Sequence, residues 1–173
     1  GRGGLAVTAP AQIPTLEGSR VGRYELKRKL ASGGMAIVYL GHLATGHGFE
    51  KWVAVKVMHP HLAEDQRFVN MFLDEARLVA RIEHPNVCSV LDFGQEEGLL
   101  YLVMEYLHGE SLSSVVRRGV RRGGTPRWLA ARLVADAARG LHAAHEQRDA
   151  DGHPLGIVHR DVSPQNIHVL YDG

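Results

Sequence analysis

The spacing of apolar residues changes once along this chain, and that change most restricts the folds that it can adopt. Before Gly109, short segments rich in Val, Leu and Ile alternate with Gly-containing turns, which is typical of strands. Five strands are expected, over residues 24–30, 36–40, 51–58, 87–93 and 99–105. From Gly109 onward apolar residues recur at helical intervals, most regularly from Pro126 to about His145. The sequence therefore predicts an α+β fold that is β-rich at first and helical afterwards.

One helix is predicted between the third and fourth strands. Its apolar residues fall on one stripe, which consists of Phe68, Met71, Phe72, Leu78, Val79 and Ile82. Glu75 lies in the middle of that stripe, where a carboxylate is costly unless it is paired or reaches water at the stripe's edge. Pro85 disfavours continuation of the helix, so we expect it to end at His84-Pro85-Asn86.

The second half carries two helix starts. Ser111 can cap a short helix that ends in Arg117 and Arg118, and Thr125 before Pro126 is typical of an N-cap with proline at the first helical position. The apolar face of the long helix consists of Leu129, Leu133, Val134, Ala137, Leu141 and Ala144.

We therefore divide the chain into three parts. Residues 1–20 mix Gly, Pro and small residues without periodicity and are expected to be a flexible leader. Residues 21–107 form the β-rich unit, and residues 108–173 form the helical one, with a hinge near 106–110.

Charge and cysteine content exclude several classes of protein. The 20 Lys and Arg residues against 19 Asp and Glu give a net charge of +1, without the basic excess of a non-specific nucleic-acid binder. The longest apolar run, from Leu99 to Met104, is too short to span a membrane, and no signal-peptide core is present. The single cysteine, Cys88, indicates a buried thiol and a reducing compartment, and the 11 scattered histidines lack zinc-ligand spacing. We expect a cytoplasmic protein without a nucleic-acid partner or a membrane segment.

Two features of the first half could bind an anion. The turn in Leu30-Ala-Ser-Gly-Gly-Met-Ala-Ile-Val38 could lay its backbone over phosphates, although such a turn is more often only a hairpin. In Val53-Ala-Val-Lys56, alternation places Lys56 on the same sheet face as Ala54, and the ordinary alternative is an exposed lysine.

Two further features supply carboxylates. The charges of Glu75 and Lys56 would each be energetically unfavourable without a partner, and an ion pair between them explains both. In His159-Arg-Asp-Val-Ser-Pro-Gln-Asn166, Asp161 and Asn166 stand five residues apart across a proline, which suits a loop that aims a carboxylate and an amide at one site.

Taken in order, VAVK, the helix glutamate, HPN, YLVMEY and HRDxxPxN resemble the protein kinase family over about residues 24–173. The amino-acid sequences of three segments are most similar to those of the bacterial eukaryotic-like (Hanks-type) Ser/Thr kinases: GGMAIVYLG, EARLVARIEHPN and HRDVSPQN. The resemblance implies a kinase-like fold with a β-rich N-lobe and the first part of a helical C-lobe. It implies an ATP- and Mg²⁺-dependent kinase that phosphorylates Ser or Thr of a protein substrate.

The resemblance also implies roles for individual residues. Lys56 would hold the α- and β-phosphates and Glu75 would orient it, Asp161 would accept the proton of the substrate hydroxyl, and Asn166 would bind Mg²⁺. Arg160 would neutralise a phosphorylated activation loop. The expected ATP-binding residues are Leu30, Ala31, Ser32, Gly33, Gly34, Val38, Ala54, Lys56, the gatekeeper Met104 and the backbone of Glu105 and Leu107.

Four positions depart from the family pattern. Ala31 and Ala36 replace two glycines of the loop, Ser163 replaces a lysine that contacts the γ-phosphate, and His168 replaces an apolar residue under the adenine. Leu91-Asp-Phe-Gly94 looks like the metal-binding DFG motif, but it precedes the catalytic loop, so no metal role is assigned to it.

The metal-binding Asp of the family would follow Gly173, so we expect an N-terminal portion of a kinase domain that transfers phosphate poorly alone. Its long helix would then expose apolar surface that further chain covers. Two alternatives remain open. One is a pseudokinase that binds nucleotide or protein without catalysis, and the four departures favour it. The other is a small-molecule kinase of related fold, which is disfavoured by HPN, Arg160 and Pro164.

Overall fold

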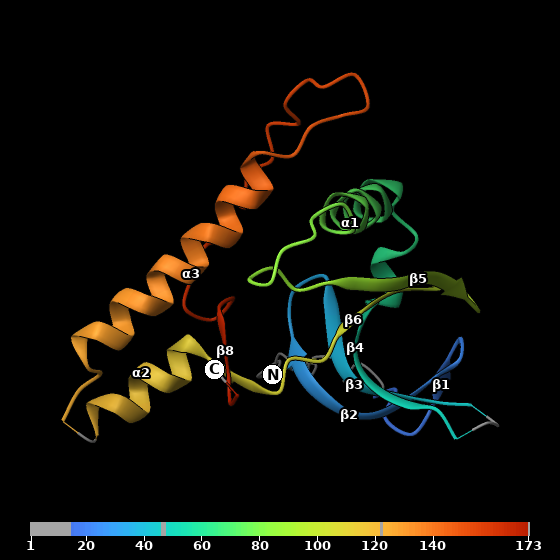
Figure 1. Ribbon diagram of the computed structural model, residues 1–173. Coiled ribbons are helices and arrows are strands. Elements are labelled where there is room, and N and C mark those ends of the chain that lie inside the picture. Colours follow the sequence, from blue (N-terminus) through green and yellow to red (C-terminus); the bar gives the residue numbers. More distant parts are fainter. Residues whose placement is uncertain (1–14, 46–47, 122, 173) are drawn as a thin grey trace, which may run out of the picture.

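The computed structural model describes residues 15–45, 48–121 and 123–172. A six-stranded antiparallel sheet occupies the first part, and two helices with a small two-stranded sheet occupy the second (Figure 1). This is the α+β arrangement, β-rich first and helical afterwards, that the apolar spacing predicts.

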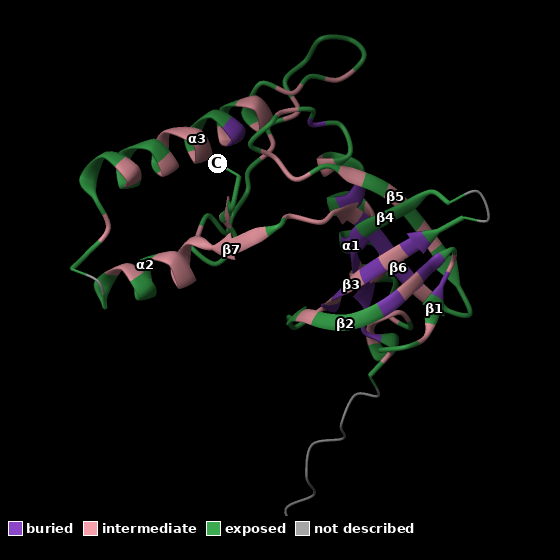
Figure 2. Cartoon of the chain, turned by 60° about the horizontal axis from the view of Figure 1, so that its bottom comes forward, coloured by how far each residue is buried: buried purple, intermediate pink, exposed green. Residues whose placement is uncertain are grey.

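The large sheet has the strand order β1-β2-β3-β4-β6-β5. Its strands are β1 (Arg20–Val21), β2 (Tyr24–Ser32), β3 (Ala36–Ala44), β4 (Glu50–Met58), β5 (Val90–Glu96) and β6 (Leu99–Glu105). The fourth expected strand, over 87–93, was placed three residues too early, because the apolar residues before Val90 lead into the strand without belonging to it. Buried residues concentrate in this sheet (Figure 2).

The first core lies on one face of the sheet, where alternate valines of β4 pack with aromatic side chains. It consists of Val21, Tyr24, Leu26, Ile37, Tyr39, Leu43, Val53, Val55, Val57, Tyr101 and Val103. Leu16 packs against it, and the Leu16 N–H donates to the Tyr39 hydroxyl at 3.3 Å. The leader expected over 1–20 is therefore wrong for residues 15–20, which contact the sheet; its remaining residues, 1–14, lie outside the described part of the chain.

The second core joins the opposite face to helix α1 (Gln66–Val79). Phe72 and Ala76 are buried against β4 and β6, and Asp65 caps the helix by accepting from the Arg67 N–H. The predicted stripe was too wide, since Met71 is 56% exposed and Ile82 is buried beyond the helix end. A short 3-10 helix, η1 (Pro60–Leu62), connects β4 to α1.

The C-terminal part holds α2 (Leu112–Val120), α3 (Arg127–His145) and a small sheet of β7 (Gly109–Ser111) and β8 (His168–Leu170). Ser111 caps α2 as predicted, by accepting from the Ser114 N–H. Thr125 does not cap α3: the N-cap is Pro126, whose backbone is still extended. The β7–β8 pair, where the hinge was expected to end, was not predicted.

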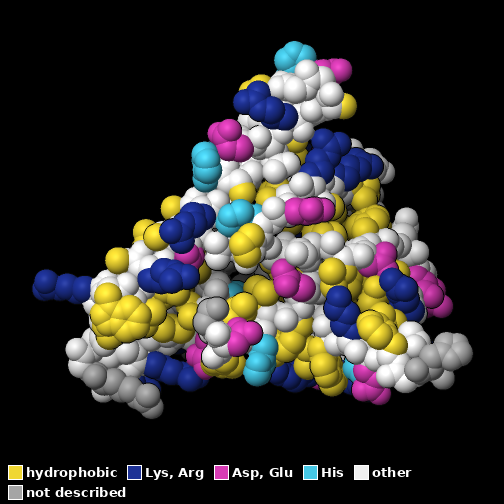
Figure 3. All heavy atoms as spheres, in the orientation of Figure 1, with side chains coloured by type: hydrophobic (Ala, Val, Ile, Leu, Met, Phe, Trp, Pro, Cys, Tyr) yellow, Lys and Arg dark blue, Asp and Glu magenta, His cyan; other side chains and the backbone are white. Residues whose placement is uncertain are grey.

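Helix α3 touches the N-lobe at Gly140, where an added Cβ would meet the Asn86 carbonyl oxygen at 2.6 Å. Two large apolar residues of this helix are exposed: Trp128 is 72% exposed and Val134 is 65% exposed. Figure 3 shows hydrophobic side chains gathered on the side formed by α2 and α3, where a groove of about 420 Å³ lies between the helices. The exposed apolar surface expected on the long helix is confirmed. None of the described helices is both long and apolar enough to cross a membrane.

Candidate active site

Four of the predicted ATP-binding residues share one face of the large sheet. Val38 on β3 stands opposite Lys56 on β4, and Ala54 on β4 stands opposite Met104 on β6. Directly opposed residues of an antiparallel pair point to the same face, and residues two apart on a strand do so as well. The expectation that Lys56 and Ala54 share a face is confirmed.

Lys56 is joined to Glu75 across the space between the sheet and α1. The Lys56 Nζ lies 2.7 Å from the Glu75 carboxylate and 5.7 Å from the centre of the Phe72 ring. Half of the Glu75 side chain is exposed, so this carboxylate both reaches water and forms the predicted pair. The pair fixes a positive charge on the sheet face that carries Val38 and Ala54.

The turn between β2 and β3 contains Gly33 and Gly34. Its closing bond runs from the Gly33 N–H to the Ala36 carbonyl, at 2.9 Å. Neither glycine has a positive φ, and an added Cβ would meet nothing closer than the Ala36 oxygen, at 3.7 Å. The fold itself therefore does not require glycine at these positions, which leaves room for close approach of a ligand.

A residue that the sequence analysis did not single out also holds this turn. His59 lies at the end of β4, and its Nε2 is 2.9 Å from the Gly33 carbonyl oxygen. In the sequence it is one of the scattered histidines, and its contact joins residues 26 positions apart that no local pattern relates.

The segment after β6 is where the base of ATP was expected to bond. The Glu105 N–H donates to the Ser89 carbonyl at 3.0 Å, and the Glu105 carboxylate accepts from the Ser89 N–H at 2.7 Å. In the part of the chain that the structure describes, the Leu107 N–H has no partner. The Cys88 Sγ lies 3.8 Å from the Glu105 carbonyl oxygen, and burial, with a smaller effect of the Glu105 charge, raises the pKa of the thiol to about 11.

Asp161 and Asn166 meet in the loop before β8. The Asn166 amide nitrogen donates to the Asp161 carboxylate at 2.7 Å and to the Asp161 carbonyl at 3.0 Å. Arg160 has a φ of 64°, a left-handed conformation that costs a non-glycine residue roughly 1–3 kcal/mol and is typical of functional loops. Two bonds to the start of α2 anchor the loop, from the Leu112 N–H to the Ile167 carbonyl and from the Ser113 N–H to the Pro164 carbonyl.

This pair has a donor set that suits Mg²⁺. Because the Asn166 nitrogen donates to Asp161, the amide oxygen of Asn166 is left for another partner. Amide and carboxylate oxygens are the ligands that Mg²⁺ prefers.

The four departures from the family pattern have different surroundings. Ala36 is buried in the second core, whereas Ala31 and His168 are exposed. The Ser163 hydroxyl is buried and has no hydrogen-bond partner among the described residues. The methyl group of Ala36 thus contributes to packing against α1.

The DFG-like segment lies in β5 and belongs to the sheet. Asp92 accepts from the Tyr24 hydroxyl at 2.8 Å and from Arg23 at 3.2 Å. Its carboxylate thereby links β5 to the start of β2.

A family model described as the protein kinase domain matches residues 24–173. The tyrosine-protein kinase MasK of Myxococcus xanthus is 46% identical over 98% of this chain and 26% of its own length. The serine/threonine-protein kinase PksC of Streptomyces coelicolor is 38% identical over 88% of this chain and 26% of its length. The chain thus spans about a quarter of these curated relatives.

Solved structures agree with the sequence relatives. The kinase domain of Mycobacterium tuberculosis PknI superposes with a TM-score of 0.70 at 29% identity, covering 92% of this chain and 59% of that domain. PpkA-294 in its apo form, at 24% identity and a TM-score of 0.70, supports the fold alone. The chain therefore belongs to the protein kinase domain family.

Proposed function

We propose that the protein containing this chain transfers the γ-phosphoryl group of ATP to a serine or threonine hydroxyl of a protein substrate. The observation that carries this proposal is the 2.7 Å ion pair between Lys56 and Glu75. It fixes an ammonium group on the sheet face that carries Val38, Ala54 and Met104. Residues 21–107 would serve as the nucleotide-binding lobe and residues 108–173 as the start of the second lobe.

ATP would lie along the face that carries Val38, Ala54 and Met104. These side chains, with Leu30, would enclose the adenine, and the free Leu107 N–H would donate to the base while the Glu105 carbonyl accepts from it. The backbone of Ala31, Ser32, Gly33 and Gly34 would cover the phosphates, since N–H groups of such a turn bind anions. Lys56 would neutralise charge on the α- and β-phosphates.

Asp161 would act on the acceptor hydroxyl. The hydroxyl oxygen attacks the γ-phosphorus, the bond from that phosphorus to the β–γ bridging oxygen breaks, and ADP leaves with the bond's electron pair. Asp161 holds the hydroxyl in position and accepts its proton. Asn166 orients the Asp161 carboxylate through the 2.7 Å bond. Arg160 would bind a phosphorylated residue of an activation loop.

Mg²⁺ fits beside this pair, with the Asn166 amide oxygen as its ligand in this chain. When bound, it supplies positive charge that neutralises the phosphate oxygens during transfer. We infer a cytoplasmic position for this domain, where ATP is available and the free thiol of Cys88 stays reduced.

A tyrosine acceptor is the second candidate. The relative with 46% identity bears the name of a tyrosine kinase, whereas PksC is named as a serine/threonine kinase. The Val-Ser-Pro segment between Asp161 and Gln165 favours serine or threonine. A pseudokinase that binds nucleotide without turnover is the third.

Phosphoamino-acid analysis separates these candidates. The purified full-length protein is incubated with Mg²⁺ and γ-³²P-labelled ATP, with a generic protein substrate, and the label is hydrolysed to single amino acids. We expect phosphoserine or phosphothreonine, and none from a Lys56→Met control. Phosphotyrosine alone would establish the second candidate, and nucleotide binding without label would establish the pseudokinase.

A further inference from the structure

His59 is tied to the glycine turn at two points. Its ring Nε2 lies 2.9 Å from the Gly33 carbonyl oxygen, and its backbone N–H donates to the Met35 carbonyl at 2.9 Å. The residue is only 4% exposed, and the ring of His61 stacks on the His59 ring with centroids 5.5 Å apart. One buried residue thus holds two carbonyl groups of the turn between β2 and β3.

The bond to Gly33 defines the state of the ring. A carbonyl oxygen can only accept, so Nε2 must carry the hydrogen. In the neutral ring Nδ1 is then an acceptor, and it has no partner within the described residues. Burial of an unpartnered nitrogen is unfavourable, so packing alone would favour an apolar side chain here. What histidine supplies that leucine cannot is the bond to Gly33.

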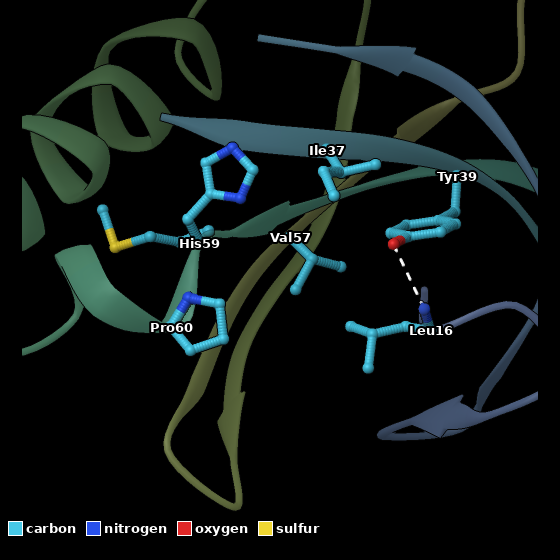
Figure 4. Close-up of a pocket in the computed structure, with 7 residues that line it drawn as sticks. Leu16, Ile37, Tyr39, Val57, His59 and Pro60 are labelled. Carbon is cyan, nitrogen blue, oxygen red and sulfur yellow. Dashed lines mark hydrogen bonds between the residues drawn. The ribbon is translucent and has the colours of Figure 1, made fainter. Parts of the chain in front are cut away.

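The surroundings of the ring exclude a ligand site of its own. Figure 4 shows His59 beside Ile37, Val57 and Pro60 at the edge of a small cavity. That cavity is about 40 Å³, whereas pockets for small molecules measure roughly 300–1,000 Å³. An effect of His59 on ligand binding must therefore be exerted through the turn that it holds.

The bond also orients a peptide group. The Gly33–Gly34 peptide is planar and trans, so the Gly34 N–H points opposite to the Gly33 carbonyl and away from His59. This N–H has no partner in residues 15–45, 48–121 and 123–172. A backbone N–H held free in a turn is the group that binds a phosphate oxygen.

We propose that His59 is a positioning residue for phosphate binding: its Nε2–H bond to the Gly33 carbonyl holds the Gly34 N–H toward the phosphates of a bound nucleotide. This inference rests on the proposed nucleotide site and adds a residue to it. It predicts that loss of the bond weakens binding of nucleotides that carry phosphates and leaves binding of adenosine unchanged.

The test measures dissociation constants of Mg·ATP, Mg·ADP and adenosine by calorimetry, on the full-length protein, three His59 variants and one control variant. His59→Leu removes the donor. His59→Gln keeps an amide N–H donor at about the position of Nε2. The side chain of His59→Asn also carries an amide nitrogen but is too short to bring it to the Gly33 carbonyl. Val103→Ala, in the first core on the face opposite Lys56, is the control for general loss of stability.

For His59→Leu we expect affinity for Mg·ATP and Mg·ADP to fall about threefold to tenfold, the range for one lost hydrogen bond. Adenosine affinity should stay at the wild-type value, and His59→Gln should bind ATP as wild type does. If His59→Leu does not fold, the same contrast is expected between His59→Asn and His59→Gln. Equal loss of ATP and adenosine affinity, or wild-type ATP affinity in both the Leu and Asn variants, would overturn the inference. Absence of ATP binding by the wild-type protein would instead overturn the proposed function, and the inference with it.

Discussion

The ammonium group of Lys56 on β4 lies 2.7 Å from the carboxylate of Glu75 on α1, 19 positions later in the chain. The sheet and the helix meet through buried Phe72 and Ala76, and this packing places the two charges together. Under the proposed function, Glu75 would act on the nucleotide through Lys56, as a positioning residue.

The first prediction concerns this pair. Lys56→Met should lower kcat/KM for ATP by about 10²–10³-fold because a positive charge on the phosphates is lost. Glu75→Gln should lower it by about 100-fold, because a misplaced group can cost that much. The double variant should have the same kcat/KM as Lys56→Met alone. The two residues act as a unit, so the loss of Lys56 already removes the effect of Glu75. Steady-state kinetics on the full-length protein provide the measurement.

Asp74→Asn is the matched control for the pair. It removes the neighbouring carboxylate of the same helix, which pairs with the exposed Arg77. This variant should leave kcat/KM unchanged. Independent, multiplicative effects of the Lys56 and Glu75 variants would show that Glu75 does not act through Lys56.

The second prediction contrasts a glycine expected to matter for ATP binding, Gly34, with one expected to matter for stability, Gly41. Gly34→Ala should leave thermal stability unchanged, because no atom lies within 4 Å of the added Cβ, yet weaken Mg·ATP binding. Gly41→Ala should destabilise the protein by about 1–3 kcal/mol, since its Cβ would meet Val55 at 2.6 Å and overpack the sheet. Thermal unfolding and nucleotide titration measure the two effects. A large stability loss in Gly34→Ala would mean that the fold requires this glycine.

The sequence was sufficient for features carried by local periodicity and by contiguous motifs. Alternation along β4 correctly placed Lys56 with Ala54, and the unfavourable position of Glu75 correctly indicated a partner. Asp161 and Asn166 lie five residues apart, so a single loop suffices to join them.

Features that depend on distant segments could not be predicted in this way. The bond from His59 to Gly33 joins the residue after β4 to the turn between β2 and β3, 26 positions earlier, and the β7–β8 pair joins residues about 60 positions apart. The stripe of α1 was drawn too wide because apolar Met71 lies at helical spacing but faces away from the sheet. Packing partners, which periodicity does not specify, decide such cases.

The third prediction concerns the thiol of Cys88. With its pKa raised to about 11, the thiolate fraction at pH 8 is about 100-fold smaller than for an ordinary cysteine, so alkylation by iodoacetamide should be slower by about that factor. The rate should rise about tenfold for each pH unit up to about pH 11. Peptide mass spectrometry follows Cys88 alone, and the unfolded protein in urea supplies the reference rate. Alkylation of the native protein at the reference rate at pH 8 would contradict the buried position.

The most direct measurement of the central claim is turnover by the Asp161→Asn variant of the full-length protein, beside its affinity for Mg·ATP. Asparagine keeps the size of the side chain and an acceptor oxygen for Asn166, but it cannot take up the proton of a hydroxyl. We expect a kcat about 10²–10⁴-fold below wild type with an unchanged dissociation constant for Mg·ATP. The control Asp151→Asn, which changes an exposed carboxylate, should keep wild-type turnover. Equal turnover by Asp161→Asn and wild type, or ATP binding without any turnover by the wild-type protein, would contradict the central claim.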